Sequence, residues 1–121
     1  IATQRAPQAI GPYSQGIKVG NTVWISGQIP LDPGSMTMVE GDISAEAEQV
    51  FSNLSAVAEA AGATLDNAVK INISLTDLGD FEAINAVMSR HFEEPYPARA
   101  CVQVAALPKG ARIEVEAILS L

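Results

Sequence analysis

Arg99 is the residue of this sequence whose type and position most clearly indicate chemistry. It follows the proline-rich segment 95–98 and stands where a strand is expected to begin, so a rigid, extended entry fixes its direction. A guanidinium presents parallel N–H donors that match the two oxygens of a carboxylate, which the ammonium of a lysine does not. We therefore expect Arg99 to bind the carboxylate of a small substrate.

Glu114 and Glu116 are the acidic residues that the expected strands could bring to this arginine. They lie on one side of the expected last strand, because alternate residues of a strand point to the same face. If that strand pairs with the strand of Arg99, a carboxylate lies near the guanidinium. The pattern fits equally well a plain Arg–Glu ion pair on the surface of a sheet, and the sequence alone leaves both interpretations open.

Cys101 and His91 are the single cysteine and the single histidine of the chain. A catalytic thiolate needs a base, and no pattern links the histidine to Cys101, so we interpret Cys101 as a small core-side residue. His91 is expected to stabilise the end of a helix. One residue of each kind gives no support for a zinc site, and the glycines form no phosphate-binding pattern. We therefore expect neither a metal nor a nucleotide cofactor.

Tyr13 and Gly27 lie in two loops that could line a site. Tyr13 precedes the first expected strand and is either a lid or hydrogen-bond donor, or a packed surface aromatic. Gly27 follows a strand directly, where a missing side chain either lets a ligand approach the backbone or marks a bulge.

Composition and charge limit the class of protein. The chain has 121 residues, 48% of them hydrophobic and 17% charged, which is typical of one folded domain over residues 1–121. Its net charge is −7, and its basic residues form no cluster, so we expect no nucleic-acid partner. No apolar run reaches the ~18 residues of a membrane span, and one cysteine fits a reducing compartment. We expect a cytoplasmic protein with no membrane partner.

Hydrophobic periodicity predicts the elements that must position these residues. Spacings of three and four predict a helix over residues 44–61. Asp42 or Ser44 can cap its start, and Gly62 can end it. The same spacing predicts a second helix that begins at residue 80 and is closed by prolines 95 and 97. Alternation and turn signals predict strands at residues 17–19, 22–26, near 38–39, 69–75, 99–104 and 113–119.

Two helices cover only one face of such a sheet, and the other face must be polar or buried elsewhere. Alternation places a mixed set of side chains there, and we infer that this face packs against other copies of the chain. The alternative is a monomer with a tolerable exposed tryptophan. The set expected on the uncovered face is Trp24, Ser26, Arg99, Cys101, Glu114 and Ile118, with Ala98, Ala100, Val102 and Val104 on the core side.

Several segments, taken together and in order, resemble the Rid family of reactive intermediate deaminases, also called the YjgF family. The resemblance covers nearly the whole chain, and the full set of segments is far more specific than any one of them. The matching segments are residues 9–15 (AIGPYSQ), 25–30 (ISGQIP), 59–63 (EAAGA), 76–78 (TDL), 80–81 (DF), 84–85 (IN), 96–99 (YPAR), 107–111 (LPKGA) and 113–117 (IEVEA).

The resemblance implies an α+β, chorismate-mutase-like fold with a mixed sheet of about six strands and two helices on one face. It also implies a homotrimer with ligand sites between subunits and no cofactor or metal. The implied activity is that of a 2-iminobutanoate/2-iminopropanoate deaminase. Such an enzyme hydrolyses enamine and imine intermediates, for example 2-aminoacrylate formed by serine and threonine dehydratases, to 2-oxo acids and ammonia.

The resemblance also assigns roles to residues of this chain. Arg99 matches the arginine that binds the substrate carboxylate, and Glu114 matches the acidic residue that positions or activates water. Tyr13 matches an aromatic residue near the cleft. Other positions match residues that line it: Ser26, Gly27, Asn85 and the backbone at Cys101.

Two other functions stay open at this point. A non-catalytic module that binds small carboxylates or chaperones other proteins would keep Arg99 without needing Glu114. A ribonuclease or inhibitor of translation, names also attached to this family, would have to bind phosphates in spite of the acidic charge balance.

Overall fold

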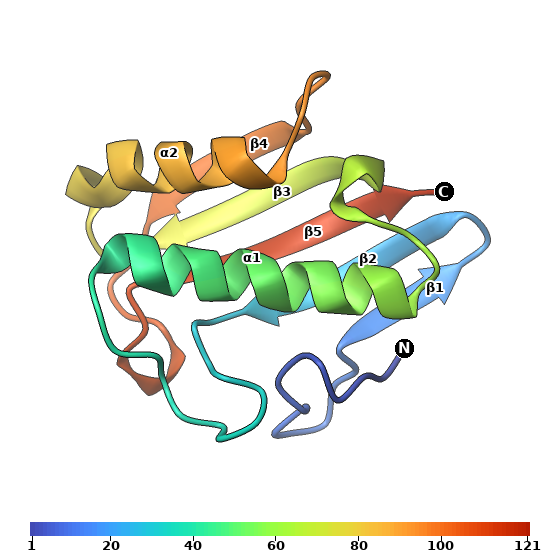
Figure 1. The fold of residues 1–121 in the computed structure, drawn as a ribbon, viewed down its shortest axis with the longest axis horizontal. Helices are drawn as coiled ribbons and strands as arrows, with labels where there is room; N and C mark the ends of the chain where they lie inside the picture. The colour runs from blue at the N-terminus through green and yellow to red at the C-terminus, as the bar shows by residue number, and fades with distance from the viewer.

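Five strands form one mixed sheet in the computed structural model, which describes residues 1–121 (Figure 1). The strand order is β1-β2-β5-β3-β4; β3 and β4 are parallel, and all other neighbours are antiparallel. The last strand in sequence is therefore the central strand, and β4 is an edge. The strands are β1 (Gly16–Val19), β2 (Thr22–Gln28), β3 (Ala68–Leu75), β4 (Ala98–Gln103) and β5 (Ile113–Ser120).

Helices α1 (Ile43–Ala60) and α2 (Phe81–His91) lie side by side on one face of the sheet (Figure 1). The α1 helix begins where Asp42 Oδ1 accepts the backbone N–H of Ala45 at 2.9 Å, and it is followed by Gly62 with a φ of 83°. Both end signals were predicted from the sequence. Short 3₁₀ turns are η1 (Leu65–Asn67), η2 (Leu78–Asp80) and η3 (Pro108–Gly110). Neither α-helix has the length and apolar character needed to cross a membrane.

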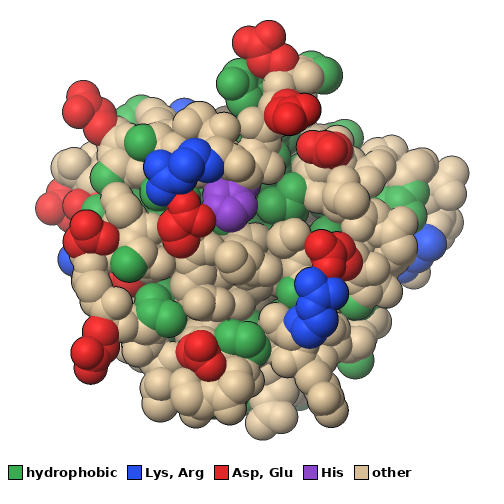
Figure 2. All heavy atoms as spheres, in the orientation of Figure 1, with side chains coloured by type: hydrophobic (Ala, Val, Ile, Leu, Met, Phe, Trp, Pro, Cys, Tyr) green, Lys and Arg blue, Asp and Glu red, His purple; other side chains and the backbone are tan.

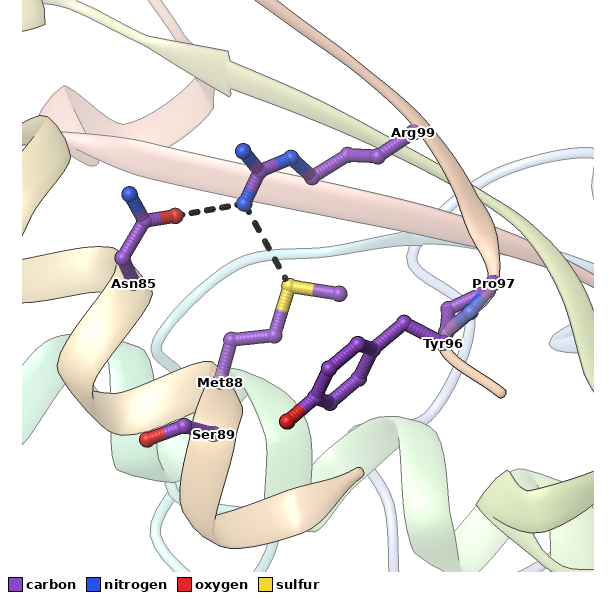
Figure 3. Close-up of a pocket in the computed structure, with 6 residues that line it drawn as sticks. All are labelled: Asn85, Met88, Ser89, Tyr96, Pro97 and Arg99. Atoms are coloured by element: carbon purple, nitrogen blue, oxygen red, sulfur yellow. Dashed lines mark hydrogen bonds between the residues drawn. The ribbon is translucent and has the colours of Figure 1, made fainter. Parts of the chain in front are cut away.

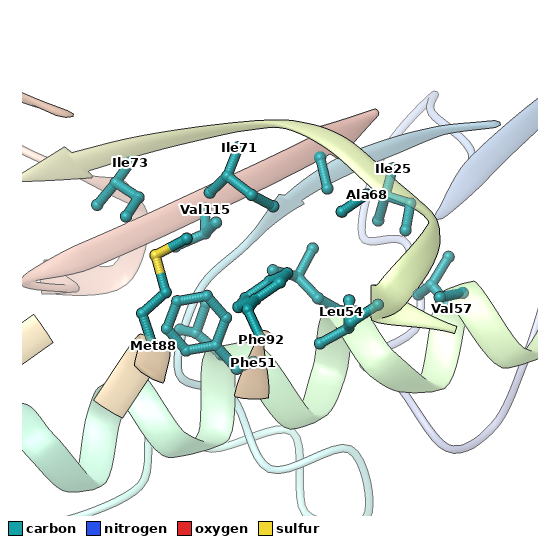
Figure 4. Close-up of a cluster of buried hydrophobic side chains, with 14 of the residues drawn as sticks. Ile25, Phe51, Leu54, Val57, Ala68, Ile71, Ile73, Met88, Phe92 and Val115 are labelled. Atoms are coloured by element: carbon teal, nitrogen blue, oxygen red, sulfur yellow. The ribbon is translucent and has the colours of Figure 1, made fainter. Parts of the chain in front are cut away.

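The core lies between this face and the helices (Figure 4). Alternate residues of the three inner strands point toward α1 and α2 and are almost fully buried, as strand alternation predicts. Phe51 of α1 meets Phe92, just after α2, edge to face with ring centres 5.7 Å apart. These contacts fix the two helices relative to the sheet.

The expected sixth strand near residues 38–39 is absent. The segment forms only one isolated antiparallel β-bridge, between Leu31 and Met38. The loop is closed locally instead, because Asp32 Oδ1 accepts the backbone N–H groups of Gly34 and Ser35 at 2.9 and 3.0 Å. The fold class and the two helices on one face are confirmed, with five strands rather than about six.

The orientation expected for β4 is wrong. Arg99 pairs with Ile71 and Cys101 with Ile73, so both side chains lie on the helix-bearing face. Ala98, Ala100 and Val102, which the sequence suggested as core residues, lie on the opposite face and are exposed. The alternation of the strand was predicted correctly, but only its register with β3 decides which side faces the helices.

The opposite face of the sheet carries no helix and has an apolar row across it. Ile17 pairs with Trp24, and Trp24 pairs with Ile118. Trp24 is 46% exposed and Ile17 is 49% exposed. Trp24, Ser26, Glu114 and Ile118 were predicted on this face, and the pairing confirms Trp24, Ile118 and Glu114 there.

Asn53 on α1 holds the loop that follows β2, and its replacement should destabilise the fold. Its Nδ2 donates to the carbonyls of Ile29 and Leu31 at 3.2 and 3.0 Å, and its side chain is 1% exposed. Asn53→Ala removes this donor from both buried carbonyls and should lower the free energy of unfolding by about 2–3 kcal/mol. Urea denaturation measures the change. Ser52→Ala, on the exposed side of the same helix, is the control, and equal effects of the two variants would contradict the assignment.

Candidate active site

Arg99 extends from β4 toward the α2 helix (Figure 3). Its Nη1 donates to Asn85 Oδ1 at 2.5 Å and to Met88 Sδ at 3.7 Å. The guanidinium carbon lies 5.1 Å from the centre of the Phe81 ring, within the range of a cation–π interaction. All three partners are uncharged, so they orient the guanidinium without neutralising it.

Arg99 differs in this respect from the other arginines of the chain. Each of the other three forms an ion pair with a glutamate, whereas no acidic side chain pairs with Arg99. The Arg–Glu surface pair that the sequence left open is therefore wrong. The three pairs are Arg5–Glu59, Arg90–Glu48 and Arg112–Glu46.

An open hollow of about 480 Å³ lies beside Arg99. Figure 3 shows side chains from α2 and from the segment before β4 on its walls. A cation without an acidic partner at such a hollow favours a small anion. The lining residues are Asn85, Met88, Ser89, Tyr96, Pro97 and Arg99.

A second hollow, of about 200 Å³, contains most of the other predicted site residues. Its walls include Tyr13, Ser26, Gly27 and Glu114. The Tyr13 hydroxyl accepts the backbone N–H of Ile10 at 3.4 Å, and Ser26 Oγ donates to the Ser14 carbonyl at 2.6 Å. The first bond closes a turn within the segment before β1, and the second ties that segment to the end of β2.

Gly27 makes room for Glu114. The pairing of β2 with β5 shifts register between Ile25 and Gln28, as expected for a bulge. A Cβ atom at Gly27 would lie 2.7 Å from Glu114 Cδ, closer than real contacts allow. Of the two roles left open for this glycine, the bulge is confirmed and the approach of a ligand stays a prediction; the group that lies against Gly27 in the structure is the Glu114 side chain.

Glu114 is partly buried, and neither a hydrogen-bond donor nor a cation acts on its carboxyl group. Burial raises the pKa of Glu114, and the like charge of Glu116 raises it further. A carboxyl group with a raised pKa exchanges protons more readily near neutral pH than an ordinary surface glutamate does.

Cys101 packs against the hydrophobic core on the same face as Arg99. Burial raises the pKa of the Cys101 thiol, and the charge of Arg99 offsets only part of this effect. The thiol therefore stays protonated, in agreement with its interpretation as a small core-side residue. His91 Nε2 lies 2.7 Å from Glu48 Oε2, and its ring stacks on Phe51, so this histidine joins the two helices.

The predicted site residues fall into two separate groups within one copy of the chain. Asn85, Arg99 and Cys101 lie on the helix-bearing side, whereas Tyr13, Ser26, Gly27 and Glu114 gather around the second hollow. The β3 strand lies between β4 and β5, so the two strands that carry Arg99 and Glu114 do not pair directly, and the condition for a carboxylate beside Arg99 is not met within one copy. No cluster of three His, Cys, Asp or Glu side chains is arranged to hold a metal ion.

Three residues around Arg99 were missed as site residues. Phe81 and Met88 fall within the second helix expected from the sequence, and Tyr96 falls within the proline-rich segment before β4. Phe81, Asn85 and Met88 have helical spacing and share one side of α2. This spacing can be seen in the sequence. The parallel register of β4 with β3, which places Arg99 against this side of α2, cannot.

Comparison with known proteins identifies the family. A family model described as Endoribonuclease L-PSP matches residues 3–120, and the chain belongs to this family, the YjgF/Rid family. A 2-iminobutanoate/2-iminopropanoate deaminase from Dermatophagoides farinae is 52% identical over 119 residues, which cover 98% of this chain and 93% of that protein. The resemblance found in the sequence is thus confirmed.

Solved structures confirm the fold. The crystal structure of RidA from an Antarctic Psychrobacter species matches with a TM-score of 0.97 and 57% identity, covering 100% of this chain and 98% of that one. Escherichia coli TdcF with bound serine matches with a TM-score of 0.94 and 42% identity, covering 100% and 97% of the two chains.

The raised pKa of Glu114 predicts how its replacement changes stability with pH. The folded chain binds this proton more tightly than the unfolded chain, so the contribution of Glu114 to stability is present at low pH and lost as the pH rises through its folded pKa. Glu114→Gln removes this loss of stability, because glutamine does not titrate. The free energy of unfolding of the variant, relative to wild type, should therefore increase as the pH rises from below 4.5, the ordinary value, to neutrality.

Urea unfolding over a pH series measures this difference. Glu82→Gln, on the exposed side of α2, serves as the control for removal of one surface charge. A difference between Glu114→Gln and wild type that falls as the pH rises would contradict the raised pKa.

Proposed function

We propose that this chain is an imine deaminase, a cofactor-independent hydrolase that converts 2-iminobutanoate and 2-iminopropanoate to 2-oxo acids and ammonia. Enamines such as 2-aminoacrylate enter the same reaction after tautomerising to imines. The observation that carries the proposal is the unneutralised guanidinium of Arg99 at an open hollow. The relatives named for this reaction support it, because they match nearly the whole chain. The free thiol of Cys101 fits a reducing compartment, and we assign the enzyme to the cytoplasm.

The reaction needs only modest catalysis, because imines already hydrolyse in water. Arg99 binds the substrate carboxylate with two N–H groups and fixes the position of the imine carbon. Glu114 accepts a proton from water as the new C–O bond forms, and the imine nitrogen takes up a proton from solvent as the C=N double bond becomes a single bond. The carbinolamine then loses ammonia as the C–N bond breaks: Glu114 returns its proton to the leaving nitrogen, and the hydroxyl gives its proton to solvent as it becomes the carbonyl.

The two halves of this machinery meet when copies of the chain assemble into a homotrimer. Arg99 and Glu114 lie on different sides of the sheet, and each stands at an open hollow without a charged partner. The helix-free face has an exposed apolar row through Trp24, which a second copy can cover. In a closed ring, the Arg99 hollow of one copy faces the Glu114 hollow of the next, which gives three equivalent sites.

The remaining predicted residues take supporting roles in this shared cleft. Asn85 orients Arg99, and Gly27 leaves room for the Glu114 carboxyl group. Tyr13 covers the cleft on the Glu114 side, where Ser26 fixes the neighbouring loop through its bond to Ser14. Cys101 lines the Arg99 side with its backbone.

The charge distribution favours this small-anion reaction over the ribonuclease activity that the family description names. The net charge is −7, and three arginines are already paired with glutamates. On the face shown in Figure 2, the larger basic groups lie beside acidic ones, and the basic side chains form no continuous patch. Phosphate chains need several clustered cations, whereas one carboxylate needs a single guanidinium.

The first test is the release of ammonia from 2-iminobutanoate, which threonine dehydratase generates in the assay. Wild type should accelerate it, and Arg99→Ala should lower kcat/KM by about 100-fold, because a charge-assisted bidentate contact is lost. Arg99→Lys should recover only part of the lost kcat/KM, since lysine restores the positive charge but not the pair of parallel N–H donors.

Glu114→Gln separates the enzyme from a non-catalytic carboxylate-binding module. It should lose turnover while still binding 2-oxobutanoate, as measured by calorimetry. No acceleration by wild type would overturn the proposal, and full turnover by Glu114→Gln would overturn the role of Glu114.

Mixing two inactive variants tests whether the site is shared between copies. In a ring of three, every mixed trimer has one interface where the intact Arg99 of one variant faces the intact Glu114 of the other. Exchange of equal amounts of Arg99→Ala and Glu114→Gln should therefore restore about one quarter of wild-type activity. Mixing Arg99→Ala with Arg99→Lys, which supplies no intact arginine, is the control. No recovery after verified exchange would overturn the shared site.

A further inference from the structure

The α2 helix surrounds one side of the Arg99 guanidinium with three different uncharged groups. The carbonyl oxygen of Asn85 and the sulfur of Met88 both accept from Nη1, at 2.5 and 3.7 Å, and the Phe81 ring lies 5.1 Å from the guanidinium carbon. Nε and Nη2 form no hydrogen bond with the protein. In Figure 3 the bonded nitrogen points to Asn85 and Met88, and the other terminal nitrogen points away from them.

We propose that Phe81, Asn85 and Met88 are positioning residues that turn Arg99 so that its Nε–Nη2 edge receives the substrate carboxylate. This inference rests on the proposed function and names the residues that prepare its anion site. Because Nη1 is already bonded, the remaining pair of parallel N–H groups is the one formed by Nε and Nη2.

Positioning matters here because a long arginine side chain on an edge strand has many rotamers. Ordering it when substrate binds would cost conformational entropy, and ordering it beforehand removes that cost from binding. The α2 helix is itself fixed, since Arg90 and His91 at its end both bond Glu48 of α1. The three groups therefore present a stable surface against which the guanidinium rests.

The absence of charge on these three groups is the second part of the inference. An acidic residue in place of Asn85 would hold Arg99 more firmly than the amide does, but it would compete with the substrate carboxylate for the same cation. If Asn85 only held Arg99 in place, an aspartate at this position would be tolerated. If Asn85 prepares an anion site, the aspartate should weaken substrate binding.

The expected results follow for variants of the assembled protein. Phe81→Leu, which keeps an apolar side chain but loses the aromatic face, should raise KM about threefold to tenfold with kcat nearly unchanged. Phe81→Tyr keeps the aromatic face and should recover a KM close to that of wild type. Asn85→Asp should raise KM by more than about tenfold, because the new carboxylate neutralises the anchor. Glu82→Gln, on the exposed side of α2, is the control for changes to this helix.

A second readout does not depend on turnover. The Nε–Hε resonance of Arg99 in a ¹⁵N correlation spectrum should shift when 2-oxobutanoate is added to wild type, and Phe81→Leu and Asn85→Asp should need a higher concentration for the same shift. If wild type binds 2-oxobutanoate but these variants keep its affinity and KM, the positioning role is overturned. A shift confined to the Nη groups would overturn the assigned edge. No response of Arg99 in wild type, together with no turnover, would instead contradict the proposed function itself.

Discussion

The place of β5 between β2 and β3 is the constraint on which the arrangement of this protein depends. Alternation along β5 sends Val115 and its apolar neighbours toward the helices and sends Glu114 and Glu116 to the opposite side. Since β3 separates β5 from the edge strand β4, the glutamate and Arg99 cannot meet within one copy. The same pairing that builds the core therefore divides the chemistry between two surfaces, and assembly of copies becomes part of the proposed mechanism.

Much of this fold could be predicted from the sequence because its elements have unambiguous periods. The α1 helix combines a continuous apolar stripe with the capping Asp42 and the terminating Gly62, and most of the β3 and β5 strands alternates. The prediction of a strand near residues 38–39 was wrong because the turn at Asp32 is closed by local hydrogen bonds rather than by strand pairing. Short segments beside turn residues carry too little periodic signal to separate these outcomes.

The β4 strand shows a different limit of prediction from sequence. Its two sets of alternating residues differ in character: Ala100 and Val102 on one side are apolar, whereas Arg99 and Cys101 on the other are a mixed set. Hydrophobicity alone favours the first set as the buried one, yet the register with β3 places it on the helix-free face. For an edge strand that one helix covers only in part, burial is decided by pairing and by neighbouring copies, which no single-strand pattern contains.

The arrangement of charge explains why one arginine stands out in an acidic protein. A chain of net charge −7 repels an anionic substrate on average, so binding depends on a local site where positive charge is not neutralised. The ion pairs of Arg5, Arg90 and Arg112 with glutamates leave Arg99 as the arginine available for this purpose. Its neutral partners on α2 keep it ordered without removing its charge. Glu114 is the acidic counterpart: it has no cation beside it, and burial with a like charge nearby keeps its carboxyl group ready to take up a proton. Arg99 is a cation without an anion and Glu114 a carboxylate without a cation, and each stands at an open hollow. In the proposed trimer, the two side chains would approach one substrate from two different copies.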